Sequence, residues 1–272
     1  MSKENGMFYA PKGKPNKVCA EGEFVFAAVG LEHGHIYGMS NGLTEAGGQL
    51  KWVYDPDPAK VNAFCRVFPQ VKIARSEEEV FSDKAVNMVA GAAITSERCA
   101  LGIRAMDAGK DYFTDKAPLT TLEQLEQAKA KVKVTGRKYA VYYSERLHVE
   151  SAVFAGQLIE DGAIGRILQV IGMGPHRHGK NRPGWFYEKD KFGGILCDIG
   201  SHQIEQFLFY TGAKDASVQF ARVANYNNKE HPYFGELILD CLNRTEKAMT
   251  QEHAFKAAEL CVKAQMAAIK IE

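Results

Sequence analysis

Several features that would assign this chain to a special class of protein are absent from its sequence. No uninterrupted apolar run approaches the roughly 20 residues that a membrane-spanning helix needs. Residues 1–17 are polar and contain lysines, without the apolar centre of a secretory signal. The net charge of +1 creates no field that would recruit nucleic acid or an anionic membrane. We therefore expect a cytoplasmic protein that has neither nucleic acid nor a membrane as a partner.

Cysteines are few and scattered, and none of them forms a Cys-x-x-Cys pair. This pattern is typical of reduced thiols in a cytoplasmic protein, and it indicates neither a disulfide framework nor a cysteine metal site. The His176–His178 pair is the other candidate for metal binding, but no third ligand is evident from the spacing. The sequence therefore predicts no metal site. The six cysteines are Cys19, Cys65, Cys99, Cys197, Cys241 and Cys261.

The composition is that of a globular protein, with 46% hydrophobic and 25% charged residues. After a polar leader over residues 1–23, short apolar runs alternate with stretches of helical pattern. This alternation predicts an α/β fold in which helices cover both faces of a doubly wound parallel sheet, within a first domain at 1–143. The predicted strands are 24–29, 50–54, 71–74, 86–90, 111–114 and 139–143, and the predicted helices are 35–45, 58–68, one that starts at Ser76, 98–108 and 121–135.

The pattern changes after Tyr143, so we expect a second domain of α+β type at 144–272. Helical periodicity predicts helices at 152–161 and 201–210, and an amphipathic terminal helix at 250–269. Segments 166–172 and 217–224 have the pattern of strands.

A glycine-containing turn follows the first predicted strand, in the segment Val29 to Ile36. Such a turn presents backbone N–H groups and a helix N-terminus to a pyrophosphate. The match to the pattern Gly-x-Gly-x-x-Gly is incomplete, because Glu32 and His35 stand where the second and third glycines would be. A carboxylate at Glu32 would repel phosphates unless it points away. The predicted cofactor-binding residues of the turn are Gly30, Leu31, Gly34, His35 and Ile36.

Asp55 ends the second predicted strand, 25 residues after Gly30. A carboxylate at this position accepts the two ribose hydroxyls of NAD and repels the 2′-phosphate of NADP. The alternative is that Asp55 only forms a turn before Pro56. Taken together with the glycine turn, it favours NAD over NADP.

The segment Gly193 to His202 combines two glycines with Asp198 and His202, which are four residues apart. If a helix begins near Asp198, both side chains share one helical face. A carboxylate beside an imidazole suits proton transfer near neutral pH. The alternative is a helix cap followed by a surface histidine.

Four motifs in this order resemble the Gfo/Idh/MocA family of oxidoreductases, over Phe24 to Thr211 and again in the final helix. They are the turn Gly30 to Gly38 with Asp55, the segment Ala108 to Pro118, the segment Gly193 to His202, and the helix Gln251 to Gln265. Asp115-Lys116-Ala117 is similar to the family's Glu-Lys-Pro motif, and Gly193 to His202 is similar to its Gly-Gly-x-x-x-Asp-x-x-x-His motif.

The resemblance implies a Rossmann domain that binds NAD(P) and an oxidation of a secondary hydroxyl on a sugar, cyclitol or related polyol. It places Lys116 between the nicotinamide and the substrate, so that Lys116 contacts both, with His202 as general acid/base and Asp198 orienting the substrate. In the family the loop before Gly193 lies beside the pocket. This implies substrate contacts from His176, Arg177 and Trp185, although a solvated basic loop is the alternative. It also implies a homo-oligomer, either a dimer or a tetramer.

The chain departs from the family pattern at four points. Ala117 stands where the family has a proline, often after a cis bond, so either the peptide is trans with the lysine displaced, or the cis form is tolerated. Arg98 stands where a histidine is common, and Glu32 where a glycine is common. After Ala224 most of the family's antiparallel sheet is absent, which shortens the second domain.

The sequence thus predicts an NAD-dependent dehydrogenase. Two alternatives remain open: a non-catalytic NAD-binding regulatory protein of the same fold, kept open by Ala117 and Glu32, and an enzyme that oxidises its substrate transiently with tightly held NAD.

Overall fold

The computed structural model describes residues 17–176, 182–223 and 232–267. Contacts along the chain divide it into two units, Met1–Ser217 and Val218–Glu272, and each unit is described here by itself. The predicted domain boundary at residue 143 stays a prediction.

The first unit contains a sheet of six parallel strands in the order β3-β2-β1-β4-β5-β6. This order reverses beside β1, as in a doubly wound sheet, so the predicted α/β class is confirmed. All six predicted strands are present, with bounds shifted by up to two residues. They are β1 (Val25–Val29), β2 (Gln49–Tyr54), β3 (Lys72–Ile73), β4 (Met88–Gly91), β5 (Asp111–Asp115) and β6 (Tyr139–Tyr142).

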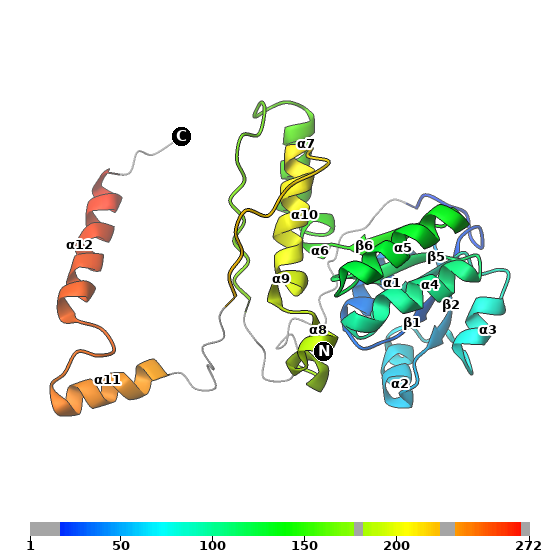
Figure 1. The fold of residues 1–272 in the computed structure, drawn as a ribbon, viewed down its shortest axis with the longest axis horizontal. Helices are drawn as coiled ribbons and strands as arrows, with labels where there is room; N and C mark the ends of the chain where they lie inside the picture. The colour runs from blue at the N-terminus through cyan, green and yellow to red at the C-terminus, as the bar shows by residue number, and fades with distance from the viewer. Residues whose placement is uncertain (1–16, 177–181, 224–231, 268–272) are drawn as a thin grey trace. The chain divides into compact units, whose positions relative to one another are not determined.

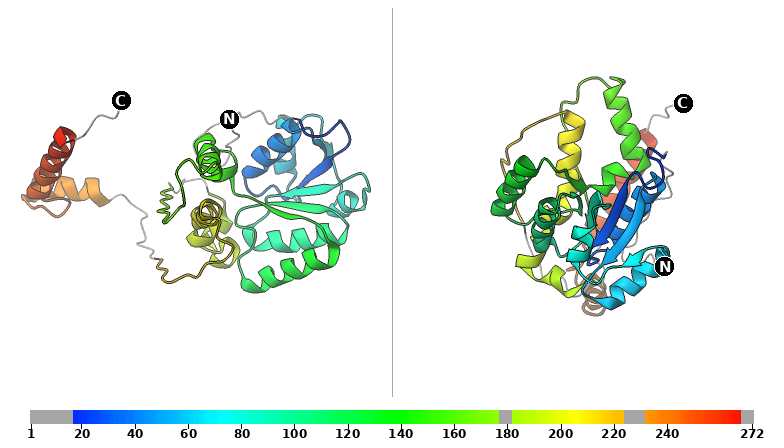
Figure 2. Two further views of the ribbon diagram at one scale, coloured as in Figure 1. Left: turned by 90° about the horizontal axis from the view of Figure 1, so that it is seen from above. Right: turned by 90° about the vertical axis from the view of Figure 1, so that its right-hand side faces the viewer.

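Helices cover both faces of this sheet (Figure 2). Strand β1 is buried along its whole length, which explains why its sequence is apolar without alternation. Its side chains point alternately to the two layers, one containing α1 (His35–Glu45) and α2 (Pro58–Val67), the other α3 (Glu77–Ser82) and α4 (Arg98–Asp107). A 3₁₀ turn, η1 (Thr95–Glu97), precedes α4, and α5 (Leu122–Thr135) packs beside it.

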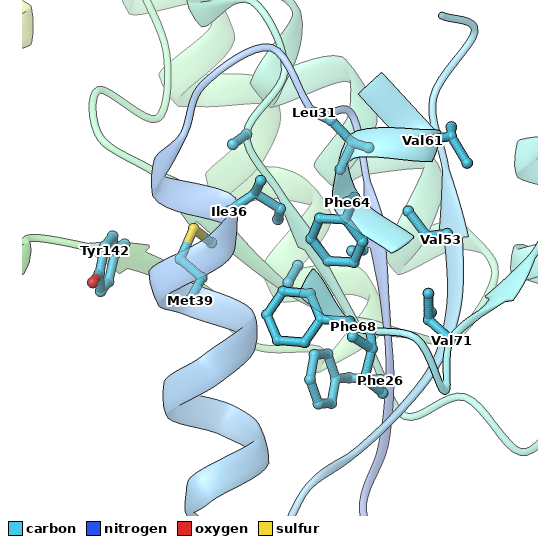
Figure 3. Close-up of a cluster of buried hydrophobic side chains, with 14 residues drawn as sticks. Phe26, Leu31, Ile36, Met39, Val53, Val61, Phe64, Phe68, Val71 and Tyr142 are labelled. Carbon is cyan, nitrogen blue, oxygen red and sulfur yellow. The ribbon is translucent and has the colours of Figure 1, made fainter. Parts of the chain in front are cut away.

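Aromatic rings dominate the layer under α1 and α2. Figure 3 shows the rings of Phe26, Phe64 and Phe68 lying together beside α1. The centroids of Phe64 and Phe68 are 4.7 Å apart, and Phe26 and Phe64 are completely buried. Burial of each such ring contributes about 1.5–3 kcal/mol, so this cluster anchors the turn that follows β1.

Local signals fix the starts of several helices. Asp57 caps α2 by accepting a 2.8 Å hydrogen bond from the backbone of Ala59, with Pro58 in the first turn. Ser76 caps α3 in the same manner, through the N–H of Glu79 at 3.2 Å. The predicted starts at Pro58 and Ser76 are therefore confirmed.

Among the described residues of the first unit, six short or medium helical segments follow β6, and α7 and α10 lie side by side (Figure 1). The hydroxyl of Tyr210 donates to the carbonyl of Ala152 at 3.0 Å, which joins these two helices. Helix α10 ends at Gly212, which adopts a left-handed conformation with φ +66°. The segments are α6 (Ser144–Leu147), α7 (Glu150–Glu160), η2 (Gly184–Tyr187), α8 (Lys189–Phe192), α9 (Ile195–Asp198) and α10 (Gly200–Thr211).

The prediction of strands at 166–172 and 217–224 is wrong for the residues that the structure describes, since neither 166–172 nor 217–223 pairs with a neighbour. Residue 224 lies outside the described part. Alternating apolar residues give a segment the composition of a strand, but a ladder also needs a partner. These two segments have no strand beside them among the described residues, and Leu168 and Phe220 are 80% and 75% exposed.

The second unit contains α11 (Pro232–Asn243) and α12 (Gln251–Ala267). Asp240 is buried and accepts hydrogen bonds from the backbone of Lys247 and Ala248, which fixes the turn between the two helices. The predicted terminal helix is confirmed over the described residues. Among the helices of the described residues, none has the length and apolar character required to cross a membrane.

Candidate active site

The turn after β1 has the conformation expected of a phosphate-binding turn. Gly30 adopts φ +74°, and a Cβ there would lie 3.0 Å from the Cβ and 3.2 Å from the Cα of Ala93. Only glycine fits this position without strain. Helix α1 then begins at His35, with Gly34 as its N-cap and no hydrogen bond from a capping side chain.

Most backbone donors of this turn are nevertheless engaged within the protein. The N–H of Leu31 donates to Asp55 at 2.6 Å, and that of His33 to the carbonyl of Ala92 at 3.0 Å. The N–H of His35 donates to Nδ1 of His33 at 3.2 Å, and Ile36, whose side chain is buried in the core, donates to the carbonyl of His33. A pyrophosphate therefore finds fewer donors here than a turn with three glycines offers.

Asp55 braces the turn from the end of β2. It is buried, and its second carboxylate oxygen accepts from the N–H of Asp57 at 2.8 Å. Each oxygen retains a further lone pair for a ligand hydroxyl. A pocket of about 310 Å³ adjoins Asp55 at the carboxyl ends of β2 and β3, with Tyr54 and Arg75 in its lining. Asp55 is thus a turn former, and its role in binding ribose stays a prediction.

Glu32 does not stand as an uncompensated charge beside the turn. Its carboxylate forms an ion pair with Lys60 of α2. The electrostatic objection to a phosphate at this turn is therefore weakened.

Lys116 and Asp198 are brought together from positions 82 residues apart. The ammonium of Lys116, which follows β5, forms an ion pair with the carboxylate of Asp198 and also donates to its carbonyl at 3.3 Å. Lys116 is 4% exposed, and the peptide between Lys116 and Ala117 is cis. Two of the three predicted catalytic residues are therefore in direct contact.

Arg98 holds the loop that contains Lys116. Its guanidinium is buried and donates to the carbonyls of Ala93, Lys116 and Ala117 and to the carboxylate of Asp115. The sequence marked Arg98 only as a departure from the family pattern. Its bracing role could not be read from the sequence, because it depends on three carbonyls converging on one side chain.

His202 lies one helical turn after Asp198, as the spacing predicts, although the helical region already begins at Ile195. The imidazole is 3% exposed, and its Nδ1 has no hydrogen-bond partner among the described residues. Burial, with a contribution from the charge of Lys116, lowers the pKa of His202 from 6.5 to about 3. The alternative of a surface histidine is thereby excluded, and the group is neutral at physiological pH.

A second cluster, formed by His33, His35 and Asp115, lies between the turn and β5. Nδ1 of His35 is 2.8 Å and Nδ1 of His33 is 3.2 Å from the carboxylate of Asp115. Burial alone would raise the pKa of Asp115, but His35, Arg98 and His33 outweigh it and keep that pKa well below its usual value. The sequence predicted His35 as a cofactor ligand and did not identify the cluster.

The three predicted substrate residues differ in where they lie. Trp185 is buried and its ring centroid is 4.1 Å from that of Phe186. Nε2 of His176 lies 3.3 Å from the carboxylate of Glu145 on α6, and its charge is among the influences on the pKa of His202. Arg177 lies outside the described residues. No contact tests the binding roles, so all three stay predictions.

Comparison with known proteins identifies the family to which this chain belongs. Residues 26–143 match the model of an oxidoreductase family with an NAD-binding Rossmann fold, the GFO/IDH/MocA family. Residues 153–249 match the C-terminal domain of the same family. The chain belongs to the Gfo/Idh/MocA family. The resemblance seen in its motifs is thereby confirmed.

Individual Gfo/Idh/MocA relatives include proteins that act on sugars and inositols. A D-xylose dehydrogenase of Paenarthrobacter nicotinovorans is 30% identical over 46% of this chain and 34% of its own. The NAD⁺-dependent scyllo-inositol 2-dehydrogenase of Bacillus subtilis (strain 168) is 28% identical over 71% of this chain and 55% of its own. This chain thus spans a third to about half of the curated relatives that it matches.

A solved structure from Erwinia carotovora atroseptica SCRI1043, whose name assigns it provisionally to the oxidoreductases, is similar over its entire chain. It is 36% identical, covers 92% of this chain and superposes with a TM-score of 0.68. The short second half of this Gfo/Idh/MocA protein therefore has a counterpart in a known structure.

The residues present fit the dinucleotide that the family binds. Gly30 permits a close approach to the backbone, and the first turn of α1 itself contains no acidic residue. Asp55 borders a pocket at the ends of β2 and β3. These features stand at the carboxyl edge of the sheet where its strand order reverses, which is where open α/β sheets bind ligands.

Proposed function

We propose that this protein is an NAD-dependent dehydrogenase that oxidises a secondary hydroxyl of a sugar, cyclitol or related polyol. The observation that carries the proposal is an ion pair between the buried Lys116 and the partly buried Asp198, near the neutral imidazole of His202, whose Nδ1 has no hydrogen-bond partner among the described residues. A cation, a carboxylate and a proton acceptor in one buried site suit the deprotonation of an alcohol.

Each of these groups has a distinct task in the proposed reaction. Lys116 donates a hydrogen bond to the substrate oxygen and stabilises the negative charge that develops there. Asp198 holds the ammonium of Lys116 and so positions it. Nδ1 of His202 accepts the hydroxyl proton. The nicotinamide, when bound, supplies the acceptor for the hydride that leaves the carbon.

The low pKa of His202 bears on the timing of proton transfer. A pKa of about 3 makes the imidazole a weak base towards an ordinary alcohol. The hydroxyl becomes strongly acidic only as the carbon loses its hydride and the oxygen becomes a carbonyl. We infer that the proton moves to His202 together with the departure of the hydride.

The proposed ligand contacts follow the sequence prediction. Gly30, Leu31, Gly34, His35 and Ile36 form the turn at the pyrophosphate. Asp55 binds the ribose and disfavours the 2′-phosphate of NADP, while Lys116 contacts the nicotinamide. The proposed substrate contacts are His176, Arg177 and Trp185.

Steady-state kinetics with NAD⁺ and a panel of pentoses, hexoses and inositols tests the proposal through the absorbance of the reduced nicotinamide. We expect Lys116→Ala and His202→Ala each to lower kcat about 10²–10⁴-fold. NAD⁺ binding, followed by quenching of tryptophan fluorescence, should survive in both variants. Lys131→Ala is the matched control, since Lys131 forms a partly exposed ion pair with Asp107 and contacts none of the proposed catalytic residues. Turnover at the level of the unmodified protein in both variants would remove the mechanism.

One observation favours a non-catalytic NAD-binding regulatory protein as the second candidate. The N–H groups of Leu31, His33 and His35 are already engaged by other groups of the protein, so fewer donors remain to hold the pyrophosphate in the position that hydride transfer requires. NAD binding without reduction on any polyol would favour this candidate. Release of NAD only on denaturation of the purified protein would instead indicate an enzyme that uses tightly held NAD transiently.

The assembly and location of the protein belong to the same proposal. We expect a homo-oligomer, a dimer or a tetramer, because apolar side chains such as Phe255 and Leu260 of α12 are 70% and 57% exposed. Light scattering after size-exclusion chromatography measures this directly. All six cysteines are free, which is consistent with a reducing, cytoplasmic environment.

A further inference from the structure

We propose that His33, His35 and Asp115 form a binding site for a divalent transition-metal ion, with Zn²⁺ as the best match. One nitrogen from each histidine and one carboxylate oxygen lie within 4.8 Å of one another. His33 and Asp115 are buried, and His35 is partly buried, so this is not a cluster of solvated surface charges.

The fold itself brings these three residues together. His33 lies in the turn after β1, His35 is the first residue of α1, and Asp115 is the last residue of β5. Both strands flank β4 in the parallel sheet, so their carboxyl ends are close in space. The two imidazoles meet edge to face, with ring centroids 4.2 Å apart, and both present Nδ1 to the same carboxylate.

A cation would stabilise the contact between His33 and Asp115. Nδ1 of His33 accepts the backbone N–H of His35 at 3.2 Å, so this nitrogen carries a lone pair and not a hydrogen. The same nitrogen faces a carboxylate oxygen of Asp115 at 3.2 Å. Two acceptors therefore approach each other at a buried position with no hydrogen between them, which is unfavourable unless a positive charge lies close by. An ion bound at Nδ1 would use the same lone pair, so it would replace the hydrogen bond from the N–H of His35.

Arg98 supplies part of that charge and also fixes the carboxylate. Its guanidinium donates to one oxygen of Asp115 at 3.0 Å, and the N–H of Lys116 donates to the other at 2.7 Å. Such partners orient a metal-binding carboxylate and hold it in place. Nδ1 of His35 lies 2.8 Å from the oxygen that Lys116 contacts, and a metal ion would take the place of the hydrogen between them.

Two imidazole nitrogens and one carboxylate oxygen make a ligand set that suits Zn²⁺. Zn–N and Zn–O bonds near 2.0–2.2 Å place the ligand atoms of a tetrahedral site roughly 3.3 Å apart. The observed separations of 2.8 Å (His35) and 3.2 Å (His33) are of this order but run to different oxygens of Asp115, so binding both histidines and one oxygen requires a small side-chain adjustment. Arg98 already balances the charge of Asp115, so the ion adds two positive charges. These favour hydroxide or an anionic ligand oxygen as the fourth ligand.

Zinc analysis of the full-length protein tests the site without reference to enzymatic activity. The protein is stripped with a chelator, dialysed against Zn²⁺ and analysed for metal content, and Co²⁺ then replaces zinc to give a visible ligand-field spectrum. We expect about one ion per chain. His33→Asn and His35→Asn should each weaken binding about 100-fold or more and abolish the tetrahedral Co²⁺ bands.

His148→Asn is the matched control, because His148 is also a partly buried histidine but pairs with Tyr142 outside the cluster. It should bind zinc like the unmodified protein. Circular dichroism melts establish that the two cluster variants are folded. Less than stoichiometric zinc in the unmodified protein would overturn the proposal, as would stoichiometric zinc retained by the folded His33→Asn, His35→Asn double variant.

Discussion

Acid should destabilise the folded protein through His202 in a way that a single substitution removes. In the folded state His202 keeps its neutral form down to a pKa of about 3, because of its burial and the charge of Lys116. In the unfolded chain the same imidazole takes up a proton below pH 6.5. Between these values the unfolded state binds more protons, so the free energy of unfolding falls as the pH falls.

The size of the effect follows from the two pKa values. Each pH unit within this window removes about 1.4 kcal/mol of stability per titrating group. At two units below 6.5, near pH 4.5, the contribution of His202 amounts to roughly 2.7 kcal/mol. This is a large fraction of the 5–15 kcal/mol that is typical of a folded domain.

Urea unfolding followed by tryptophan fluorescence measures this contribution, since both tryptophans, Trp52 and Trp185, lie in the first unit. His202→Gln cannot take up the proton. As the pH falls from 6.5 towards 3, the free energy of unfolding of the unmodified protein should therefore fall by about 1.4 kcal/mol per pH unit relative to that of this variant. Comparing the two proteins cancels the other groups that titrate.

Tyr143→Phe is the control for this experiment. The ring centroids of Tyr143 and His202 are 6.4 Å apart, and burial raises the pKa of the Tyr143 hydroxyl. Its hydroxyl carries no charge in acid, so its curve should run parallel to that of the unmodified protein. If the His202→Gln curve were parallel as well, His202 would titrate alike in both states, and the argument from its burial would be refuted.

Three further substitutions have outcomes that the packing predicts. Gly102→Ala would place a Cβ 2.4 Å from the ring of Tyr112, and chemical denaturation should show a loss of about 1–3 kcal/mol or more; an unchanged midpoint would contradict this packing. Arg98→Met leaves Asp115 buried without its guanidinium, and thermal melts should reveal a cost of about 3–5 kcal/mol. Asp55→Ser removes a carboxylate that repels a 2′-phosphate, so fluorescence titration should show NADPH binding strengthened about tenfold or more relative to NADH. An unaltered preference would argue against Asp55 as the ribose ligand.

The Rossmann half of the fold could be predicted from the sequence because its signals are local. Fully buried strands such as Val25–Val29 are continuous apolar runs, and Asp57 and Ser76 cap the helices that follow them. The second half could not be predicted as well. The segment 166–172 has the alternation of a strand, yet it pairs with no other strand in the described part of the chain. Pairing depends on a neighbouring strand, and the sequence of the segment itself does not reveal whether there is one.

The candidate site shows the same division between local and distant information. The four-residue spacing of Asp198 and His202 predicts that they share a helical face, and the structure places Asp198 at the end of α9 and His202 in the first turn of α10, which follows after one residue. The cluster around Asp115 was missed, although the His-x-His pair at 33 and 35 was a visible signal. Its third member comes from another strand, and only the order of strands in the sheet reveals that it is near.

The ion pair between Lys116 and Asp198 has a consequence for when the candidate site can form during synthesis of the chain. Lys116 is synthesised 82 residues before Asp198, after the residues of β1 to β5 and before those of β6. Until the residues of α9 have been synthesised, this ammonium cannot pair with Asp198. A fragment that ends after β6 would consequently present this lysine to water, and the last step in assembling the site would await the arrival of the later helices.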